Sequence, residues 1–191
     1  MKTIQSIMAI LMLFATTQLF AQKVEIDVNK SELTWLGKKV TGEHDGTIKL
    51  KDGYVTMKDG NITGGKFHID MTTIVNTDIE DAEYKAKLEG HLKSDDFFGV
   101  ATYPLSTLEI KKASAFKNGT AKVKAHLTIK ETTLPIEFDV TKKGDMMMAE
   151  IVVDRAKFDV RYGSGSFFDD LGDKMIYDDF TLNVSLATTS N

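Results

Sequence analysis

The stretch "TAKVKAHLTIKETTLPIEFDV", Thr120–Val140, decides the fold class of this chain. Apolar residues occupy every second position in both of its halves, and lysines, threonines, His126 and acids stand between them. Successive side chains of a β-strand point to opposite sides of a sheet, so this period predicts two strands with one apolar face and one wet face. The apolar positions are Val123, Ala125, Leu127, Ile129, Leu134, Ile136, Phe138 and Val140.

The same alternation returns near the end of the chain, in Phe180, Leu182, Val184 and Leu186. Five residue pairs between apolar segments have the composition of tight hairpin turns, because Asn, Asp and Gly accept the positive φ angles that such turns need. These pairs are Asp45-Gly46, Asp52-Gly53, Asp59-Gly60, Asn118-Gly119 and Gly144-Asp145. About eight to ten strands in one antiparallel domain follow from this spacing.

A sheet with one apolar face must cover that face, either with a second sheet or by closing on itself. An eight-stranded barrel leaves an interior that side chains fill or that holds one elongated ligand. The alternation alone leaves these outcomes open.

One segment, residues 79–98, predicts a short helical region. Asp78 and Asp81 are start signals for a helix. Apolar residues then recur at every fourth position, in Tyr84, Leu88 and Leu92. The narrow apolar stripe predicts a helix against a sheet edge or across a barrel mouth.

The segment ends in "HLKSDDFF", His91–Phe98, which admits two interpretations. In the first interpretation the segment is a corner of the fold. Ser94 is the N-cap of a second short turn, the negative charges of Asp95 and Asp96 are favourable at the N-terminus of that turn, and the phenylalanines are apolar anchors. As a catalytic site, His91 with Asp95 or Asp96 would transfer protons. The local physics favours the corner, because no second histidine or carboxylate pair at ligand spacing supports chemistry or a metal site.

The N-terminus is typical of a secretory signal peptide: Lys2 precedes an apolar run, Ile7–Ala15, and Ala21 is the expected cleavage site. The run is too short to span a bilayer. We therefore expect an exported protein, periplasmic or secreted, whose mature domain is residues 22–191.

The composition excludes several functions. There is no cysteine, so the chain has neither disulfides nor thiol chemistry. Without Lys2 the 24 basic residues become 23, against 28 acidic ones, a net charge near −5. Nucleic acid is therefore not an expected partner, and an anionic membrane surface is not favoured.

Five segments, in order and spacing, resemble the YceI-like family of exported polyisoprenoid-binding proteins. They are "WLGKKVTGEHDGTIKL" (35–50), "GGKFHIDMTTI" (64–74), "HLKSDDFFGVATYP" (91–104), "AHLTIKETTLPIEFDV" (125–140) and "VDRAKFDVRYGSGSFFDDLGDKMIYDDFTLNV" (153–184). The resemblance implies an all-β, eight-stranded antiparallel, lipocalin-like barrel that holds a long isoprenoid, polyprenyl or quinone-type, with no established catalytic residue. Two glycines of the family pattern are here Ala125, whose methyl would narrow the interior, and Glu131, in a turn.

The predicted lining is apolar, although core packing alone also explains each of its residues. It consists of Trp35, Ile48, Phe67, Ile69, Phe97, Phe98, Val123, Leu127, Ile129, Phe138, Ile151, Val153, Phe158 and Tyr162. His44, His91 and Arg155 are candidate head-group contacts; an ion pair of Arg155 with Asp154 or Asp159 is the structural alternative. His68 and His126 should face outward.

Three functions remain: a carrier or buffer of an isoprenoid lipid, including stress-related sequestration; an enzyme that acts on such a lipid through the His91 corner; or a solid-core interaction protein without a ligand. We expect no metal or other cofactor and no stable membrane insertion. The sequence leaves homodimer formation open.

Overall fold

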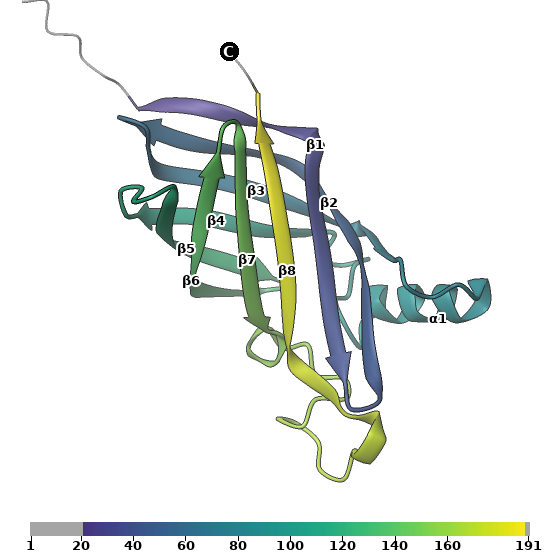
Figure 1. Cartoon of the computed structure of the whole chain (residues 1–191). Coiled ribbons are helices and arrows are strands. Elements are labelled where there is room, and N and C mark those ends of the chain that lie inside the picture. Colours follow the sequence, from purple (N-terminus) through teal and green to yellow (C-terminus); the bar gives the residue numbers. More distant parts are fainter. Residues whose placement is uncertain (1–20, 190–191) are drawn as a thin grey trace, which may run out of the picture.

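In the computed structural model, which describes residues 21–189, each strand pairs with the next along the chain and β8 pairs with β1 (Figure 1). The result is a closed, antiparallel, eight-stranded barrel with one short α-helix, as predicted. Its strands are β1 (Gln22–Lys39), β2 (Gly42–Lys58), β3 (Asn61–Asn76), β4 (Leu105–Ala113), β5 (Thr120–Ile129), β6 (Thr132–Lys143), β7 (Met146–Asp154) and β8 (Ile176–Thr188). Residues 1–20 of the predicted signal peptide lie outside the described residues.

The quoted stretch forms β5 and β6, joined by a tight turn in which Lys130 has a φ of 55°. Leu127 lies opposite Leu134 and Val123 opposite Phe138, so the apolar residues of both strands share the inner face. On the outer face Lys122 pairs with Asp139 at 2.9 Å. His126 is exposed and His68 hydrogen-bonds the surface carboxylate of Asp52, as predicted for outward-facing residues.

Two of the five predicted turns are wrong. Asp45-Gly46 and Asp52-Gly53 lie inside β2, whereas Asp59-Gly60, Asn118-Gly119 and Gly144-Asp145 do form turns with positive φ. The two misassigned glycines serve close packing instead. A Cβ on Gly46 would lie 1.9 Å from the carbonyl oxygen of Val75, and one on Gly53 would lie 2.6 Å from the Phe67 ring.

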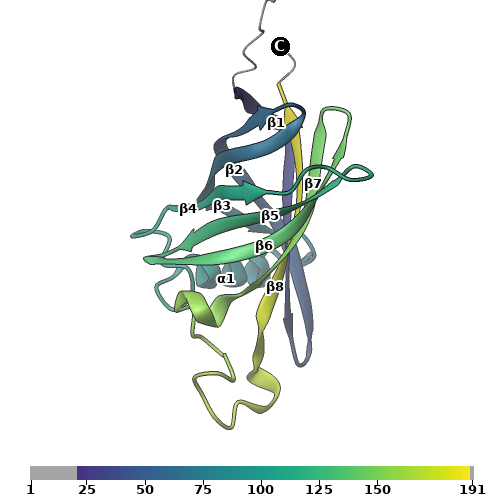
Figure 2. The ribbon, with the colours of Figure 1, turned by 90° about the vertical axis from the view of Figure 1, so that its left-hand side faces the viewer.

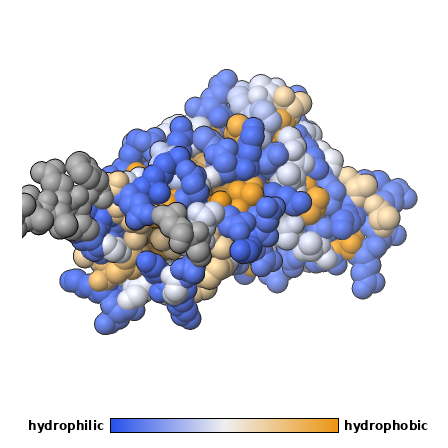
Figure 3. Space-filling view, turned by 90° about the horizontal axis from the view of Figure 1, so that it is seen from above, coloured by the Kyte–Doolittle hydropathy of each residue, from blue (hydrophilic) through white to orange (hydrophobic). Residues whose placement is uncertain are grey.

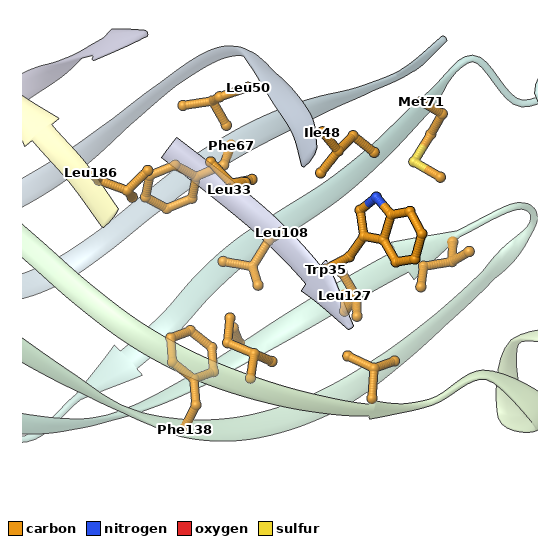
Figure 4. Packing of buried hydrophobic residues seen from close by; sticks show 14 of the residues in the cluster. Leu33, Trp35, Ile48, Leu50, Phe67, Met71, Leu108, Leu127, Phe138 and Leu186 are labelled. Atoms are coloured by element: carbon orange, nitrogen blue, oxygen red, sulfur yellow. The ribbon is translucent and has the colours of Figure 1, made fainter. Parts of the chain in front are cut away.

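The buried apolar residues fill the space between the strands (Figure 4). Leu33 and Trp35 from β1, Phe67 from β3 and Leu127 from β5 point into the interior from different sides. Most of the surface seen from above is hydrophilic (Figure 3). The molecule therefore has the apolar interior and polar exterior that the alternation predicts.

Helix α1 (Ala82–Lys93) follows β3. The Asp81 side chain accepts hydrogen bonds from the backbone N–H groups of Glu83 and Tyr84, as a helix N-cap does. The predicted N-cap role of Ser94 is wrong: its hydroxyl donates to the His91 carbonyl at 2.8 Å and ends α1. Terminal carbonyls of a helix lack partners within it, and Ser94 supplies one. The helix therefore ends at Lys93, and residues 95–98 form a turn.

The ladder between β6 and β7 is the shortest in the barrel. It joins Val140–Lys143 to Met146–Ala149, and beyond it the two strands separate (Figure 2). Leu134 and Ile136 point inward in the separated part of β6 but are only half-buried. The inward-facing side chains of the barrel are thus less completely buried where β6 separates from β7.

Two short 3-10 helices, η1 (Arg155–Phe158) and η2 (Gly172–Lys174), lie in the connection from β7 to β8. With α1 and the β1–β2 turn, this connection occupies one end of the barrel (Figures 1 and 2). No helix among residues 21–189 is long and apolar enough to cross a membrane.

Candidate binding cavity

The barrel interior contains a cavity beside α1 and the β7–β8 connection. Its volume is about 120 Å³. Nearly all of its wall is aliphatic or aromatic. The lining residues are Leu33, Trp35, Gly37, Ile48, Ile69, Met71, Ile74, Leu92, Phe97, Phe98, Ser106, Leu127, Ile129, Arg155, Ile176, Tyr177, Phe180 and Leu182.

A second cavity, of about 80 Å³, lies toward the other end of the barrel. It is lined by Leu33, Leu50, Val55, Ile62, Phe67, Ile69, Leu108, Ile110, Leu127, Phe138, Val140, Met147, Met148, Ala149, Ile151, Leu182, Val184 and Leu186. Leu33, Ile69, Leu127 and Leu182 line both cavities. These four residues, called the junction here, mark where the two spaces meet. Both cavities are smaller than typical small-molecule sites, and they are neighbouring apolar spaces along the barrel interior, so a long tail requires side chains of the wall to move.

Within residues 21–189, Arg155 is the one charged side chain in the cavity lining, and it is 2% exposed. Its guanidinium donates to the backbone carbonyls of Val160 (2.8 Å), Tyr162 (2.9 Å), Ile176 (3.0 Å) and Tyr177 (3.2 Å). Arg155 thereby fixes four main-chain positions around its side chain. These hydrogen bonds close this end of the barrel.

The remaining N–H of Arg155 faces Asp178, whose Oδ1 lies 3.4 Å from Nη2. Burial lowers the pKa of Arg155, although Asp178 and Asp154 oppose this shift, and arginine stays protonated. The predicted ion pair with Asp154 or Asp159 is wrong, because Asp154 caps η1 and Asp159 pairs with Arg161. Four of the five N–H donors of Arg155 bind main-chain carbonyls and the fifth faces Asp178, whose buried Oδ1 forms no hydrogen bond, so the guanidinium is directed at the protein and not at a ligand head group.

The His91 corner is held by aromatic packing. The His91 ring meets the Tyr162 ring edge-on, with centroids 4.2 Å apart, and the Phe97 ring, with centroids 5.7 Å apart. Asp95 and Asp96 are exposed, and among residues 21–189 no hydrogen bond or ion pair joins either of them to His91. The structure therefore does not bring the predicted acid–base group together.

His44 belongs to a polar cluster that fixes α1 to the strands. Its Nδ1 lies 2.9 Å from Oδ2 of Asp78, whose Oδ1 accepts from the Asp45 N–H at 3.0 Å and from the Asn76 amide. Burial raises the pKa of Asp78, but the hydrogen bonds from His44, Asp45 and Asn76 outweigh it and lower the pKa. Glu89 of α1 accepts from the Asn76 N–H at 2.9 Å. The cluster accounts for His44 without a ligand.

Most of the predicted lining residues do face the two cavities: Trp35, Ile48, Phe67, Ile69, Phe97, Phe98, Leu127, Ile129, Phe138 and Ile151. Val123, Val153 and Phe158 are buried but lie outside the cavity walls, as does Ala125, so its methyl does not narrow them. Tyr162, predicted near an end of the lining, is 47% exposed and lies outside the two cavity walls. Whether a ligand touches these residues stays a prediction.

Sequence reasoning missed several lining residues, notably Phe180, Leu182 and Val184 of β8. They were identified as one apolar face and are only half-buried, because they border the cavity space. Ile74 of β3 and Leu92 of α1 were also missed. Their alternation or helical spacing was visible in the sequence, but nothing in it shows which buried side chains border an unfilled space.

Comparisons with known proteins identify the fold. A family model described as a YceI-like domain matches residues 24–188. BcnA from Burkholderia cenocepacia has a similar structure, with a TM-score of 0.68 and 20% identity over 86% of this chain and 99% of that one.

A polyisoprenoid binding domain from Saccharophagus degradans, implicated in plant cell wall breakdown, has a TM-score of 0.63 at 16% identity, over 88% of this chain and 98% of its own. The YCEI protein of Campylobacter jejuni has a TM-score of 0.51 at 22% identity, over 69% and 75% of the two chains. The search of curated proteins found no match. Within residues 21–189, no three metal-ligating side chains gather into a possible metal site.

Proposed function

The chain belongs to the YceI-like domain family, and we propose that it binds a long isoprenoid lipid, with the apolar tail lying in the two neighbouring cavities of the barrel. The observation that carries the proposal is the pair of apolar cavities that share the junction residues. The polyisoprenoid-binding description of the Saccharophagus degradans domain, which has the same fold, supports the lipid class.

Hydrophobic burial supplies the affinity in this proposal. Each buried methylene contributes about 0.8 kcal/mol, so about ten of them contribute about 8 kcal/mol before ordering costs. The polar end of the lipid finds no free donor on Arg155 and therefore lies outside the apolar space. Which lipid the protein binds then depends on the length and width of the lipid tail.

We place this activity outside the cytoplasm, after cleavage at Ala21, where the protein would carry, buffer or sequester the lipid in the periplasm or a secreted medium. The N-terminal pattern of Lys2 and the run Ile7–Ala15 supports export. A cysteine-free domain also folds without help from disulfide chemistry in that compartment.

The direct test is native mass spectrometry of the mature protein, residues 22–191, purified from an exporting host. We expect a lipid adduct that solvent extraction removes and that added polyprenol restores. An adduct whose mass shows a chemically converted lipid would favour an enzyme. Failure to bind any polyprenol or quinone would contradict the proposal and favour an interaction protein.

Two neighbouring substitutions make the test specific to the cavity. Leu127→Lys places a charge at the junction, and His126→Lys places the same charge on the outer face. We expect the first to abolish lipid retention and the second to preserve it, with circular dichroism verifying that both variants fold. Equal retention would show that the tail does not occupy the junction.

A further inference from the structure

An exposed apolar patch lies at the end of the barrel that carries the β7–β8 connection. Seven large hydrophobic side chains are exposed among the described residues, and five of them belong to the β1–β2 turn, this connection or the start of β8. These five, called the end patch, are 41–50% exposed: Val40, Tyr162, Phe167, Phe168 and Tyr177. The other two, Tyr84 and Val152, lie on α1 and on the outer face of β7.

Hydrogen bonds hold the segments of the end patch together. The N–H of Val40 donates to the Met175 carbonyl at 3.1 Å, and the N–H of Ile176 donates to the Gly163 carbonyl at 2.8 Å. The Arg155 guanidinium binds the carbonyls of both Tyr162 and Tyr177. In both ribbon views the β7–β8 connection extends past the strands at the same end as the β1–β2 turn (Figures 1 and 2). The patch is thus one fixed surface.

The two adjacent phenylalanines are presented by a structured turn. The carbonyl of the fully buried Ser164 accepts from the N–H groups of Phe167 and Phe168, both at 3.1 Å. Its hydroxyl accepts from the N–H of Ser166, whose own hydroxyl donates to Asp178 at 2.6 Å. Exposing two aromatic rings costs free energy in water, and a turn built to do so indicates an apolar partner.

The end patch is continuous with the cavity. Tyr177 is exposed in the patch and also lines the first cavity, together with its neighbour Ile176. A tail that leaves the cavity beside Tyr177 therefore emerges among Tyr162, Phe167 and Phe168. Aromatic side chains of this kind sit stably at the interface between a bilayer and water.

We propose that the end patch docks the protein on the surface of a zwitterionic lipid bilayer, so that the lipid tail passes directly between bilayer and cavity. The proposal rests on the proposed function. Asp169, Asp170 and Asp173 are exposed beside the phenylalanines, and the exposed cations Arg161, 5.0 Å from the Phe167 ring, and Lys174 offset part of their charge, so the patch has no net attraction for an anionic surface. The partner is therefore a neutral bilayer, held by aromatic insertion in place of charge attraction, and contact is reversible because only a few side chains insert.

The test is flotation of the mature protein with phosphatidylcholine vesicles. The variant Phe167→Ser with Phe168→Ser removes two rings of the patch, and Tyr84→Ser with Val152→Ser removes two even more exposed apolar side chains elsewhere. We expect the first pair to lower vesicle partitioning at least about tenfold, since each lost ring removes a buried aromatic surface. The control pair should bind as the wild type does, and added phosphatidylserine should weaken binding.

A second readout separates docking from cavity binding. Trp35 is the only tryptophan of the chain and lines the first cavity, so its fluorescence reports occupancy. With detergent-dispersed polyprenol all variants should respond alike, whereas transfer from vesicles should slow only in the phenylalanine variant. Absence of a Trp35 response would contradict the proposed function and leave flotation as the measure of docking.

Three outcomes would overturn the docking proposal: wild-type protein that does not float, phenylalanine and control variants that float equally, or vesicle transfer that does not depend on the patch. Light scattering after gel filtration tests the other occupant, a second copy of the chain. If the phenylalanine variant converts a dimer to a monomer, the end patch is a subunit interface and the bilayer assignment is wrong.

Discussion

The indole Nε1 of Trp35 donates to the carbonyl oxygen of Val75 at 3.2 Å, across the strand β2 that separates them. The bond is possible because Gly46, between them in β2, has no side chain: a Cβ there would lie 1.9 Å from the Val75 oxygen and 2.6 Å from Trp35. One residue without a side chain thus sets the position of the cavity's only indole.

Replacing Gly46 with alanine should therefore destabilise the barrel by at least about 3 kcal/mol, because both neighbours must move in a packed wall. Urea unfolding measures the change. Gly90→Ala is the matched control, since a Cβ at this exposed position of α1 meets nothing within 4 Å. It should stabilise the protein by about 0.5–1 kcal/mol through helix propensity. Equal effects of the two alanines would refute the packing argument.

The junction should discriminate ligands by tail length. Leu182→Phe enlarges a side chain where the two cavities meet, and Asn183→Phe adds the same ring to the next, exposed position of β8. Titration with polyprenol, followed by Trp35 fluorescence, should show an affinity loss of about tenfold or more for Leu182→Phe only.

Farnesol, whose tail is much shorter, should bind that variant nearly as well as the wild type, because its tail need not pass the junction. A loss of the same size for farnesol and for the long polyprenol would mean that the two cavities do not act as one tail site.

Arg155 should contribute strongly to stability through its four main-chain acceptors. Arg155→Met leaves the carbonyls of Val160, Tyr162, Ile176 and Tyr177 without their donor, and Asp178 without its cation. The expected loss is about 3–5 kcal/mol by urea unfolding. Limited proteolysis should then cut first within residues 160–176.

Arg155→Lys keeps the charge but has a single nitrogen in place of the planar guanidinium, so it reaches fewer carbonyls. Its stability should fall between those of the wild type and Arg155→Met. A lysine variant as stable as the wild type would mean that charge alone, through Asp178, matters at this position.

The Asp78 cluster should make stability depend on acid pH. The pKa of Asp78 is lowered in the folded protein from its ordinary value of 3.8, so the folded state favours the carboxylate. Its stabilising contribution is present above the unfolded pKa and is lost as the pH falls through the lower, folded pKa.

Urea unfolding of the wild type and of Asp78→Asn should therefore differ at neutral pH and converge toward pH 2. A difference that persists unchanged in acid would mean that shape, and not the charge of Asp78, holds His44 and Asn76. Glu83, exposed on α1, offers the control substitution Glu83→Gln, which should leave the pH profile nearly unchanged.

The sequence was sufficient to predict antiparallel strands with one apolar face, because the inner faces of β5, β6 and β8 follow an unbroken period of two, whereas the closed barrel was predicted from the resemblance to the YceI-like family. It was insufficient in β2, where Asp-Gly pairs suggested turns. Asp45-Gly46 and Asp52-Gly53 consist of the same residue types as Asp59-Gly60, which does form a turn. The first two pairs stay extended because Trp35 and Phe67 pack against their glycines from other strands.

The cavity walls could be predicted only in part for a similar reason. Alternation places Val123 and Leu127 on the same inner face, yet one is packed solid and the other borders open space. That difference depends on how β6 separates from β7 and how far each strand tilts, which one strand's pattern does not contain. Arg155 was misassigned because its partners are backbone carbonyls, which every residue carries.

The nearly unbroken hydrocarbon wall has a calorimetric consequence. Water inside it finds almost no group to bind, so an entering chain displaces solvent that was already poorly satisfied. Titration calorimetry should then record heat released at 25 °C together with a negative heat-capacity change, the pattern of an apolar guest in a poorly hydrated host.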